Sequence, residues 1–195
     1  MPETPKAAPR ASSARLSASR RSIKALVVLA VIAAFVYGID QYSKYLVTEF
    51  LTLGEQVPVL GEFLQFNYVK NAGAAFSLGS GTTWIFAIIA SAVAIFIVAF
   101  AHRIRSVGWA VLFGMLLGGN LGNLTDRLMR EPGFGIGHVV DFLQLYAFPA
   151  IFNVADIAIV SSMGLFIILT LRGIGLDGRR NASKVAQVPN APDVP

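Results

Sequence analysis

Two carboxylates in the second half of the chain have the surroundings that acid–base chemistry needs. Asp141 lies between apolar residues in GHVVDFLQL, and Asp156 follows Asn153 by three positions in FNVAD. Positions i and i+3 share one face of a helix, so Asn153 and Asp156 project on the same side. Two acids that meet share one proton, and such a pair can activate a water while protonating the carbonyl that the water attacks.

The same acids also have a purely structural explanation. A carboxylate in the first turn stabilises a helix N-terminus, and this would account for Asp156 alone. The sequence does not show that Asp141 and Asp156 meet, because a separation of 15 residues only permits it. At the level of residue types and spacing, a catalytic pair and a helix cap both remain open.

A further polar cluster lies in GGNLGNLTDR, residues 118–127. Asn120, Asn123 and Arg127 recur at intervals of three and four, so they share one helical face, with Asp126 beside it. The glycines of this stretch allow a second helix to approach closely. The polar face is either the wall of a site or a contact between packed helices, since Asn forms hydrogen bonds across helices in lipid.

Two more polar stretches precede it. Asp40 and Lys44, in DQYSK, are spaced as an (i, i+4) pair that can neutralise itself. They are either an interfacial ion pair or part of a site wall. Asn71 begins NAGAAFS, where small residues permit close approach of the backbone and the amide offers both a donor and an acceptor. This stretch is equally typical of a turn that enters a helix.

The composition excludes several classes of protein. Of the 195 residues 55% are hydrophobic and 14% are charged, with a mean hydropathy of +0.64, whereas a soluble domain has about 25% charged residues. The absence of cysteine excludes disulfides, thiolate metal sites and a cysteine nucleophile, and two histidines are too few for a His-rich metal site. The basic residues flank apolar runs without interleaved aromatics, so we expect no nucleic-acid partner.

Four apolar runs approach the roughly 20 residues that a helix needs to cross a bilayer. We predict helices over about 24–47, 84–101, 107–125 and 151–171. The first run follows basic residues, as in a signal peptide, but no clear small-x-small cleavage site follows it, so we expect this helix to be retained. The fold class is therefore an all-α membrane protein with four transmembrane helices.

The remaining segments are polar. Residues 54–80 are too polar to span lipid, and the alternation in LQFNYV predicts one or two strands within 59–69. Residues 1–22 and 173–195 are predicted to be disordered tails, which leaves a membrane domain over 23–172.

Of the 16 Lys and Arg residues, 12 lie on the side of the termini and 4 on the other side. Both termini are therefore expected to be cytoplasmic.

Five motifs in this order, DQYSK, NAGAAF, GNLTDR, VVDF and FNVAD, resemble bacterial lipoprotein signal peptidases, the signal peptidase II family, over residues 25–171. The resemblance implies an intramembrane aspartyl protease of the bacterial cell (inner) membrane, with its site on the extracytoplasmic side. A protease of this family removes signal peptides from prolipoproteins by cutting N-terminal to a diacylglyceryl-modified cysteine. It also implies a small extracytoplasmic β-cradle over about 57–79 and a short helix around 130–148.

The resemblance also implies roles for individual residues. Asp141 and Asp156 correspond to the catalytic pair, without a metal or a cofactor. The residues grouped with substrate binding are Asp40, Lys44, Asn71, Gly73, Asn123, Asp126, Arg127 and Asn153, of which Asp126 is a supporting residue. The implied partners are diacylglyceryl-modified prolipoproteins, membrane lipids and globomycin-type inhibitors, and the protein is expected to be a monomer.

Two other classes remain as alternatives to an enzyme. In a proton- or ion-coupled transporter, Asp141 and Asp156 would relay protons, but this needs acids or breaks near the middle of the membrane. The lack of an internal repeat also disfavours a transporter built from paired halves. In a noncatalytic scaffold, the Asn and Asp residues would only hold the helices together.

Overall fold

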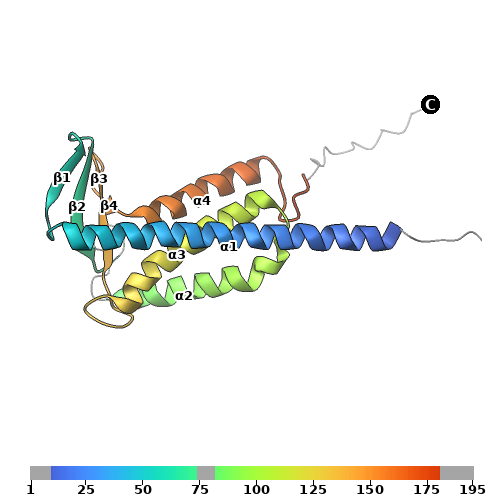
Figure 1. The fold of residues 1–195 in the computed structure, drawn as a ribbon, viewed down its shortest axis with the longest axis horizontal. Helices are drawn as coiled ribbons and strands as arrows, with labels where there is room; N and C mark the ends of the chain where they lie inside the picture. Colours follow the sequence, from blue (N-terminus) through green and yellow to red (C-terminus); the bar gives the residue numbers. More distant parts are fainter. Residues whose placement is uncertain (1–9, 74–81, 181–195) are drawn as a thin grey trace, which may run out of the picture.

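The structure, a computed structural model, describes residues 10–73 and 82–180, with side chains from Ser22 onward. The elements are α1 (Arg10–Phe50), β1 (Gln56–Leu60), β2 (Leu64–Asn71), α2 (Thr83–Phe100), the 3₁₀ helix η2 (Ala101–Arg103), α3 (Val107–Met129), β3 (Val139–Leu145), β4 (Ile151–Phe152) and α4 (Val154–Leu171). The α-helices form a bundle, and the strands form a sheet at one end of it (Figure 1).

Within the described residues, four helices are long and apolar enough to cross a membrane. They cover Ser22–Phe50, Thr83–Arg103, Val107–Met129 and Val154–Leu171. Large apolar side chains such as Phe35, Ile95 and Ile167 are exposed on them, as lipid-facing residues of a membrane bundle are. The predicted fold class, four transmembrane helices with a small sheet, is confirmed.

The first helix is longer than the sequence suggested. It begins at Arg10, inside the segment 1–22 that was expected to be disordered. After the proline at position 9, residues 10–24 contain no proline and are rich in Ala, Arg and other residues that tolerate a helix. A membrane helix can therefore extend backward through them, because adding residues to an existing helix avoids the cost of nucleation.

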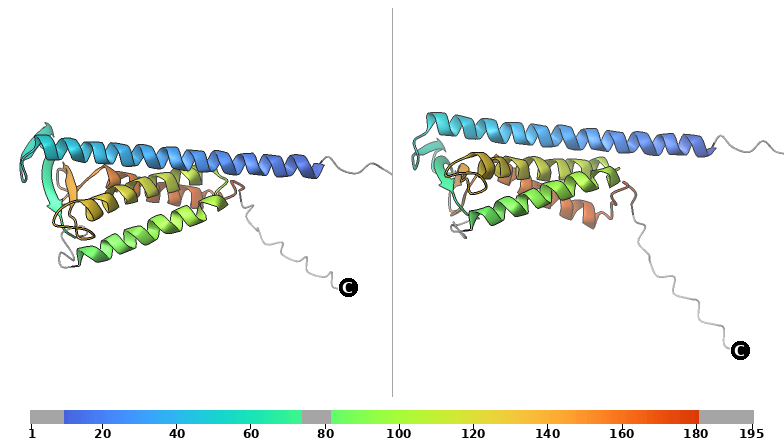
Figure 2. Two further views of the ribbon diagram at one scale, coloured as in Figure 1. Left: turned by 60° about the horizontal axis from the view of Figure 1, so that its bottom comes forward. Right: turned by 90° about the horizontal axis from the view of Figure 1, so that it is seen from below.

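Helix α3 is the centre of the bundle, since α1, α2 and α4 all pack against it. Figure 2 shows it between α1 and α2. Glycines allow the close approach: a Cβ added at Gly118 would lie 2.6 Å from the carbonyl oxygen of Ala33 in α1, and one at Gly119 would lie 2.6 Å from that of Ala155 in α4. This spacing brings the polar residues of three helices within hydrogen-bonding reach.

Gly118→Ala is expected to destabilise the protein by about 1–3 kcal/mol, because the new methyl group would force α1 away from α3. The matched control is Gly164→Ala in the middle of α4, where an added Cβ meets nothing within 4 Å. That change should be neutral or slightly stabilising, since Ala favours a helix. Thermal unfolding in detergent compares the two variants, and an equal loss of Tm in both would contradict this account of the packing.

The sheet has four antiparallel strands in the order β1-β2-β3-β4. Strand β2 confirms the strand predicted within 59–69, whereas β1 begins at Gln56, three residues before that range. The helix expected around 130–148 is wrong, because β3 occupies 139–145 and pairs with β2, with Val69 opposite Asp141. VVDFLQL contains β-branched and aromatic residues that suit a strand. The implied β-cradle over 57–79 is described only as far as Gly73.

The chain after α4 is folded as far as the structure describes it. Ile174 forms a β-bridge with Arg180 and accepts a hydrogen bond of 2.8 Å from Nε1 of Trp109. The amides of Arg105 and Ser106 both donate to the carbonyl oxygen of Leu176. The segment expected to be disordered from residue 173 is therefore ordered through Arg180, since these contacts satisfy its backbone groups. Residues 181–195 lie outside the described part.

Candidate active site

A cavity of about 490 Å³ lies at the sheet end of the bundle, between the sheet and the ends of α3 and α4. Both Asp141 and Asp156 line it. The other polar lining residues are Asn71, Gly73, Asn123 and Arg127, and the larger apolar ones are Leu145, Phe148, Phe152, Ile157 and Val160. A cavity with a few convergent polar groups and an otherwise apolar wall is typical of a ligand or substrate site.

Asp141 is presented to this cavity by strand β3. Successive side chains of a strand point to opposite faces, so its neighbours Val140 and Phe142 enter a buried apolar cluster while Asp141 faces the cavity. Its two carboxylate oxygens accept hydrogen bonds from Nδ2 of Asn153 at 2.6 Å and from Nδ2 of Asn71 at 2.9 Å.

The electrostatic setting of Asp141 favours its protonated form. Burial raises its pKa to about 7, and the negative charge of Asp156 acts in the same direction. Hydrogen bonds from Asn71 and Asn153 and the charge of Lys44 oppose the shift. Near neutral pH this carboxyl group therefore exchanges readily between its acid and base forms, as a general acid or base requires.

Asp156 is held at the third position of α4 by a capping box. The backbone amide of Asp156 donates to Oδ1 of Asn153 at 3.0 Å, and the backbone amide of Asn153 donates to Oδ2 of Asp156 at 3.1 Å. Nδ2 of Asn123 in α3 donates to its other oxygen, Oδ1, at 2.9 Å. The helix cap and the place in the cavity are therefore properties of one residue rather than alternatives.

Two asparagines connect the acids. Nδ2 of Asn153 donates to Oδ1 of Asp141 and also, at 3.0 Å, to Oδ1 of Asn123, whose own Nδ2 donates to Asp156. The structure thus brings together Asp141 and Asp156, which the spacing alone only permitted to meet. Each carboxylate accepts a hydrogen bond from one of these two side-chain amides.

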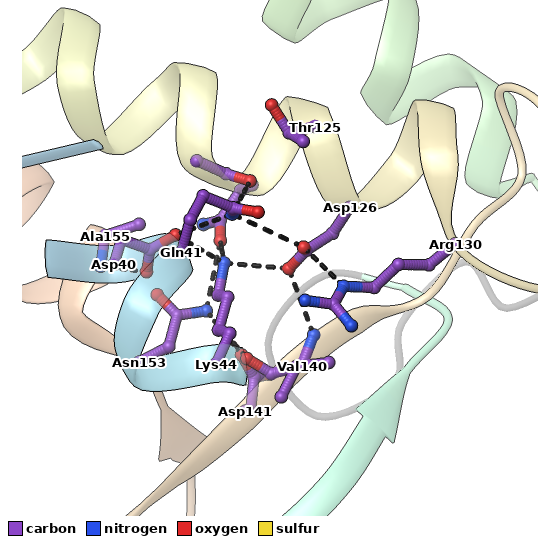
Figure 3. A network of polar contacts seen from close by, with 12 residues as sticks. Asp40, Gln41, Lys44, Thr125, Asp126, Arg130, Val140, Asp141, Asn153 and Ala155 are labelled. Carbon is purple, nitrogen blue, oxygen red and sulfur yellow. Dashed lines mark hydrogen bonds and ion pairs between the residues drawn. The ribbon is translucent and has the colours of Figure 1, made fainter. Parts of the chain in front are cut away.

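A buried ionic network lies behind this wall (Figure 3). Nζ of Lys44 lies 2.8 Å from carboxylate oxygens of both Asp40 and Asp126, and all three side chains have 0% exposure. Asp126 also contacts Nε of Arg130 at 2.6 Å, and Asp40 accepts the backbone amide of Ala155 at 2.9 Å. The network therefore joins α1, α3 and the start of α4.

The position of this network bears on the residues that the resemblance grouped with substrate binding. Asn71, Gly73, Asn123 and Arg127 line the cavity, where a substrate can touch them. The remaining residues of that group are fully buried and do not line it: Asp40, Lys44, Asp126 and Asn153. In this conformation they support the residues of the wall instead of contacting a ligand.

Arg127 has a donor to spare at the cavity. Its Nη2 donates to the carbonyl oxygen of Gly73 at 2.8 Å, and its guanidinium lies 5.1 Å from the centre of the Phe86 ring. Its Nη1 is buried and has no hydrogen-bond partner among the described residues. Asn120, which the sequence placed on the same helical face, instead donates to the carbonyl oxygen of Ala90 in α2 and connects two helices.

Two features of the site were not predicted from the sequence. The apolar lining residues, such as Phe148 and Phe152, were missed because apolar residues are everywhere in a membrane protein. Gln41 was also missed, although its Nε2 donates to Asp40, to the carbonyl oxygen of Gly122 and to Asp126. Within the described ranges, no group of three or more His, Cys, Asp or Glu residues is arranged to hold a metal ion.

Comparisons with known proteins bear on the chemistry. The model of a family described as signal peptidase (SPase) II matches residues 32–172. A lipoprotein signal peptidase of Leifsonia xyli subsp. xyli is 61% identical over 175 residues, which cover 90% of this chain and 81% of that protein. One of Streptomyces coelicolor is 45% identical over 158 residues, which cover 81% of this chain and 77% of that protein.

Solved structures show the same fold. One bacterial membrane enzyme superimposes with a TM-score of 0.67 and 31% identity, covering 74% of this chain and 88% of its own. A second gives a TM-score of 0.65 and 33% identity, covering 74% of this chain and 92% of its own.

Proposed function

The chain belongs to the signal peptidase (SPase) II family, and we propose that it is an intramembrane aspartic endopeptidase that cuts prolipoproteins directly before a diacylglyceryl-modified cysteine. Membership of this family makes the chain a protease of lipoprotein processing. Its four helices that can cross a membrane make it a multi-pass membrane protein. The observation that carries the proposal is the pair Asp141 and Asp156 on one cavity wall, each held by asparagine amides.

The pair performs the hydrolysis by sharing one proton. The ionised acid removes a proton from a water in the cavity as the water oxygen attacks the scissile carbonyl carbon, and the protonated acid donates its proton to the carbonyl oxygen. When the tetrahedral intermediate collapses, the C–N bond breaks, the leaving nitrogen takes the proton that came from water, and one hydroxyl of the intermediate returns a proton to the acid that protonated the carbonyl oxygen. The amides of Asn123 and Asn153 keep both carboxyl groups oriented through these steps.

The other lining residues bind the substrate in this proposal. Asn71, Gly73, Asn123 and Arg127 offer polar contacts to the peptide near the scissile bond. The apolar part of the wall, which includes Phe148, Phe152 and Val160, suits lipid chains or apolar side chains of the signal peptide, and a globomycin-type inhibitor would occupy the same cavity.

The orientation in the membrane follows from the distribution of charge. The start of α1, the α2–α3 connection and the end of α4 lie at the end of the bundle opposite the sheet (Figure 1). Twelve of the 16 Lys and Arg residues belong to that end or to the terminal segments, so this end and both termini are cytoplasmic. The cavity then faces the extracytoplasmic side of the bacterial inner membrane. Among the described residues its lining comes from a single chain, which supports a monomer.

A reconstituted cleavage assay tests this function. The purified full-length protein in lipid is given a prolipoprotein whose cysteine carries a diacylglyceryl group and, in parallel, the same prolipoprotein without it. We expect only the modified substrate to be cut, at the bond before the cysteine, with the products identified by mass. Equal cleavage of both substrates, cleavage at another bond, or no cleavage by a folded sample would overturn the proposal.

A further inference from the structure

The orientation of an asparagine amide is decided by neighbours that can only donate or only accept a hydrogen bond. An ammonium group has three donors and no acceptor, so the atom that it meets at hydrogen-bonding distance must be the amide oxygen. Nζ of Lys44 lies 2.9 Å from Oδ1 of Asn123. The amide nitrogen of Asn123 is consequently turned toward Oδ1 of Asp156, to which it donates at 2.9 Å.

The second asparagine of the bridge is oriented in a different way. The backbone amide of Asp156 is a pure donor and fixes Oδ1 of Asn153, so Nδ2 of Asn153 faces Asp141. This Nδ2 also approaches Oδ1 of Asn123 at 3.0 Å, but its shortest contact, 2.6 Å, is with Asp141. Asn153 is therefore set by the helix cap, whereas the orientation of Asn123 depends chiefly on a charged side chain from α1.

Lys44 is placed to have this effect without touching a substrate. Its side chain has 0% exposure and does not line the cavity. Its charge is balanced within the network, where Lys44 and Arg130 face Asp40 and Asp126 (Figure 3). Its ammonium group lies between these two carboxylates and donates to Oδ1 of Asn123.

We propose that Lys44 is a positioning residue, which fixes the amide of Asn123 so that a donor, and never an acceptor, faces Asp156. This inference rests on the proposed function. With the donor in place, Asp156 is the acid that is ready to be ionised, and the shared proton resides on Asp141. If the amide were turned, its oxygen would face Asp156 and repel the carboxylate.

The charged groups around Asp156 come from three elements. Lys44 and Asp40 face it from α1, Arg127 from α3 and Asp141 from β3. A change at Lys44 therefore alters both a charge near Asp156 and the donor that faces it. The double variant below also loses the negative charge of Asp40, so it keeps the net charge of the wild type and is compared with the wild type as well as with the single variant.

The test compares Asp40→Asn with Asp40→Asn/Lys44→Met. The double variant removes one positive and one negative charge and leaves Asp126 paired with Arg130, whereas the single variant keeps Lys44 next to Asp126 and Asn123. Met matches the length of the aliphatic stem of Lys but lacks the terminal donor. Because both proteins share the change at Asp40, the difference between them reports Lys44.

We expect the double variant to have a kcat about tenfold lower than the single variant below neutral pH. The acidic limb of its kcat–pH profile should lie about one pH unit higher, because an ionised Asp156 is harder to form. KM should stay within about twofold, because Lys44 does not touch the substrate. If either protein fails to fold or to cleave, Lys44→Gln in the wild-type chain takes its place, and its shorter amide should move the limb in the same direction.

Three outcomes would overturn the inference in distinguishable ways. If the wild type cuts the modified prolipoprotein and the pH profiles of kcat coincide for the proteins compared, Lys44 is only a structural cation and the proposed function stands. A rise in KM without a change in kcat would likewise exclude positioning. If the folded wild type does not cut the substrate, the proposed function fails and the role of Lys44 fails with it.

Discussion

Asp156→Asn is expected to lower kcat for the modified prolipoprotein by on the order of 10²–10⁴-fold while leaving the protein folded in the membrane. Asn has nearly the same shape, and its side-chain oxygen can still accept the backbone amide of Asn153, so the start of α4 keeps its cap. It cannot exchange a proton with water. Asp141→Asn should have the same effect, because the pair needs both the acid and the base.

The control for these variants is Asp177→Asn. Asp177 lies at the opposite end of the bundle, half exposed, with Arg179 as its nearest cation at 3.8 Å. This change should leave both turnover and Tm unaltered. Turnover at the wild-type rate by a folded Asp156→Asn protein would make Asp156 a helix cap only, and attention would return to Asp126 and Asp141.

The helices were predictable because a membrane helix is a local property of the sequence. About 20 apolar residues in a row suffice, and this placed α2 and α4 within three residues at each end. The start of α1 was misplaced because polar residues such as Ser and Arg can either continue a helix or remain disordered. Strand β3 was missed because its stabilisation comes from pairing with β2, about 70 residues away in the sequence.

The acids of the site were predictable from the sequence, but which residues line the cavity and which lie behind its wall was not. Charged residues near a membrane are few, so Asp141, Asp156 and Lys44 could be selected directly from the sequence. Whether each one lines a cavity or lies behind it depends on packing between α1, α3 and α4. The contact between Asp40 and the amide of Ala155, which spans 115 positions, shows how far such information lies beyond local spacing.

The pH dependence of cleavage follows from the buried carboxyl group of strand β3. Its pKa of about 7 means that Asp141 is protonated below neutral pH and becomes ionised as the pH rises through that value. Above it Asp141 is ionised and cannot donate a proton to the carbonyl oxygen. We therefore expect kcat to fall on the alkaline side with a midpoint near 7, measured on the wild type in lipid.

Asn71→Ala should move this alkaline limb to higher pH. Nδ2 of Asn71 donates to Asp141 at 2.9 Å and stabilises its ionised form, so its removal raises the pKa of Asp141 further, by about one unit. Asn67→Ala is the matched control, because Asn67 lies on the same strand and donates to Gln144 instead. Its limb should coincide with that of the wild type.

The midpoint of kcat is the informative quantity in this comparison. Asn71 also lines the cavity, so its loss is expected to raise KM as well. A change in KM alone would mean that Asn71 binds substrate without acting on Asp141. A limb that moved to lower pH would show that the amide stabilises the protonated form of Asp141 instead of the ionised form. A limb that did not move would show that another group titrates there, and the shared proton would then have to be assigned to Asp156. The response of this limb thus decides which acid of the pair carries the proton.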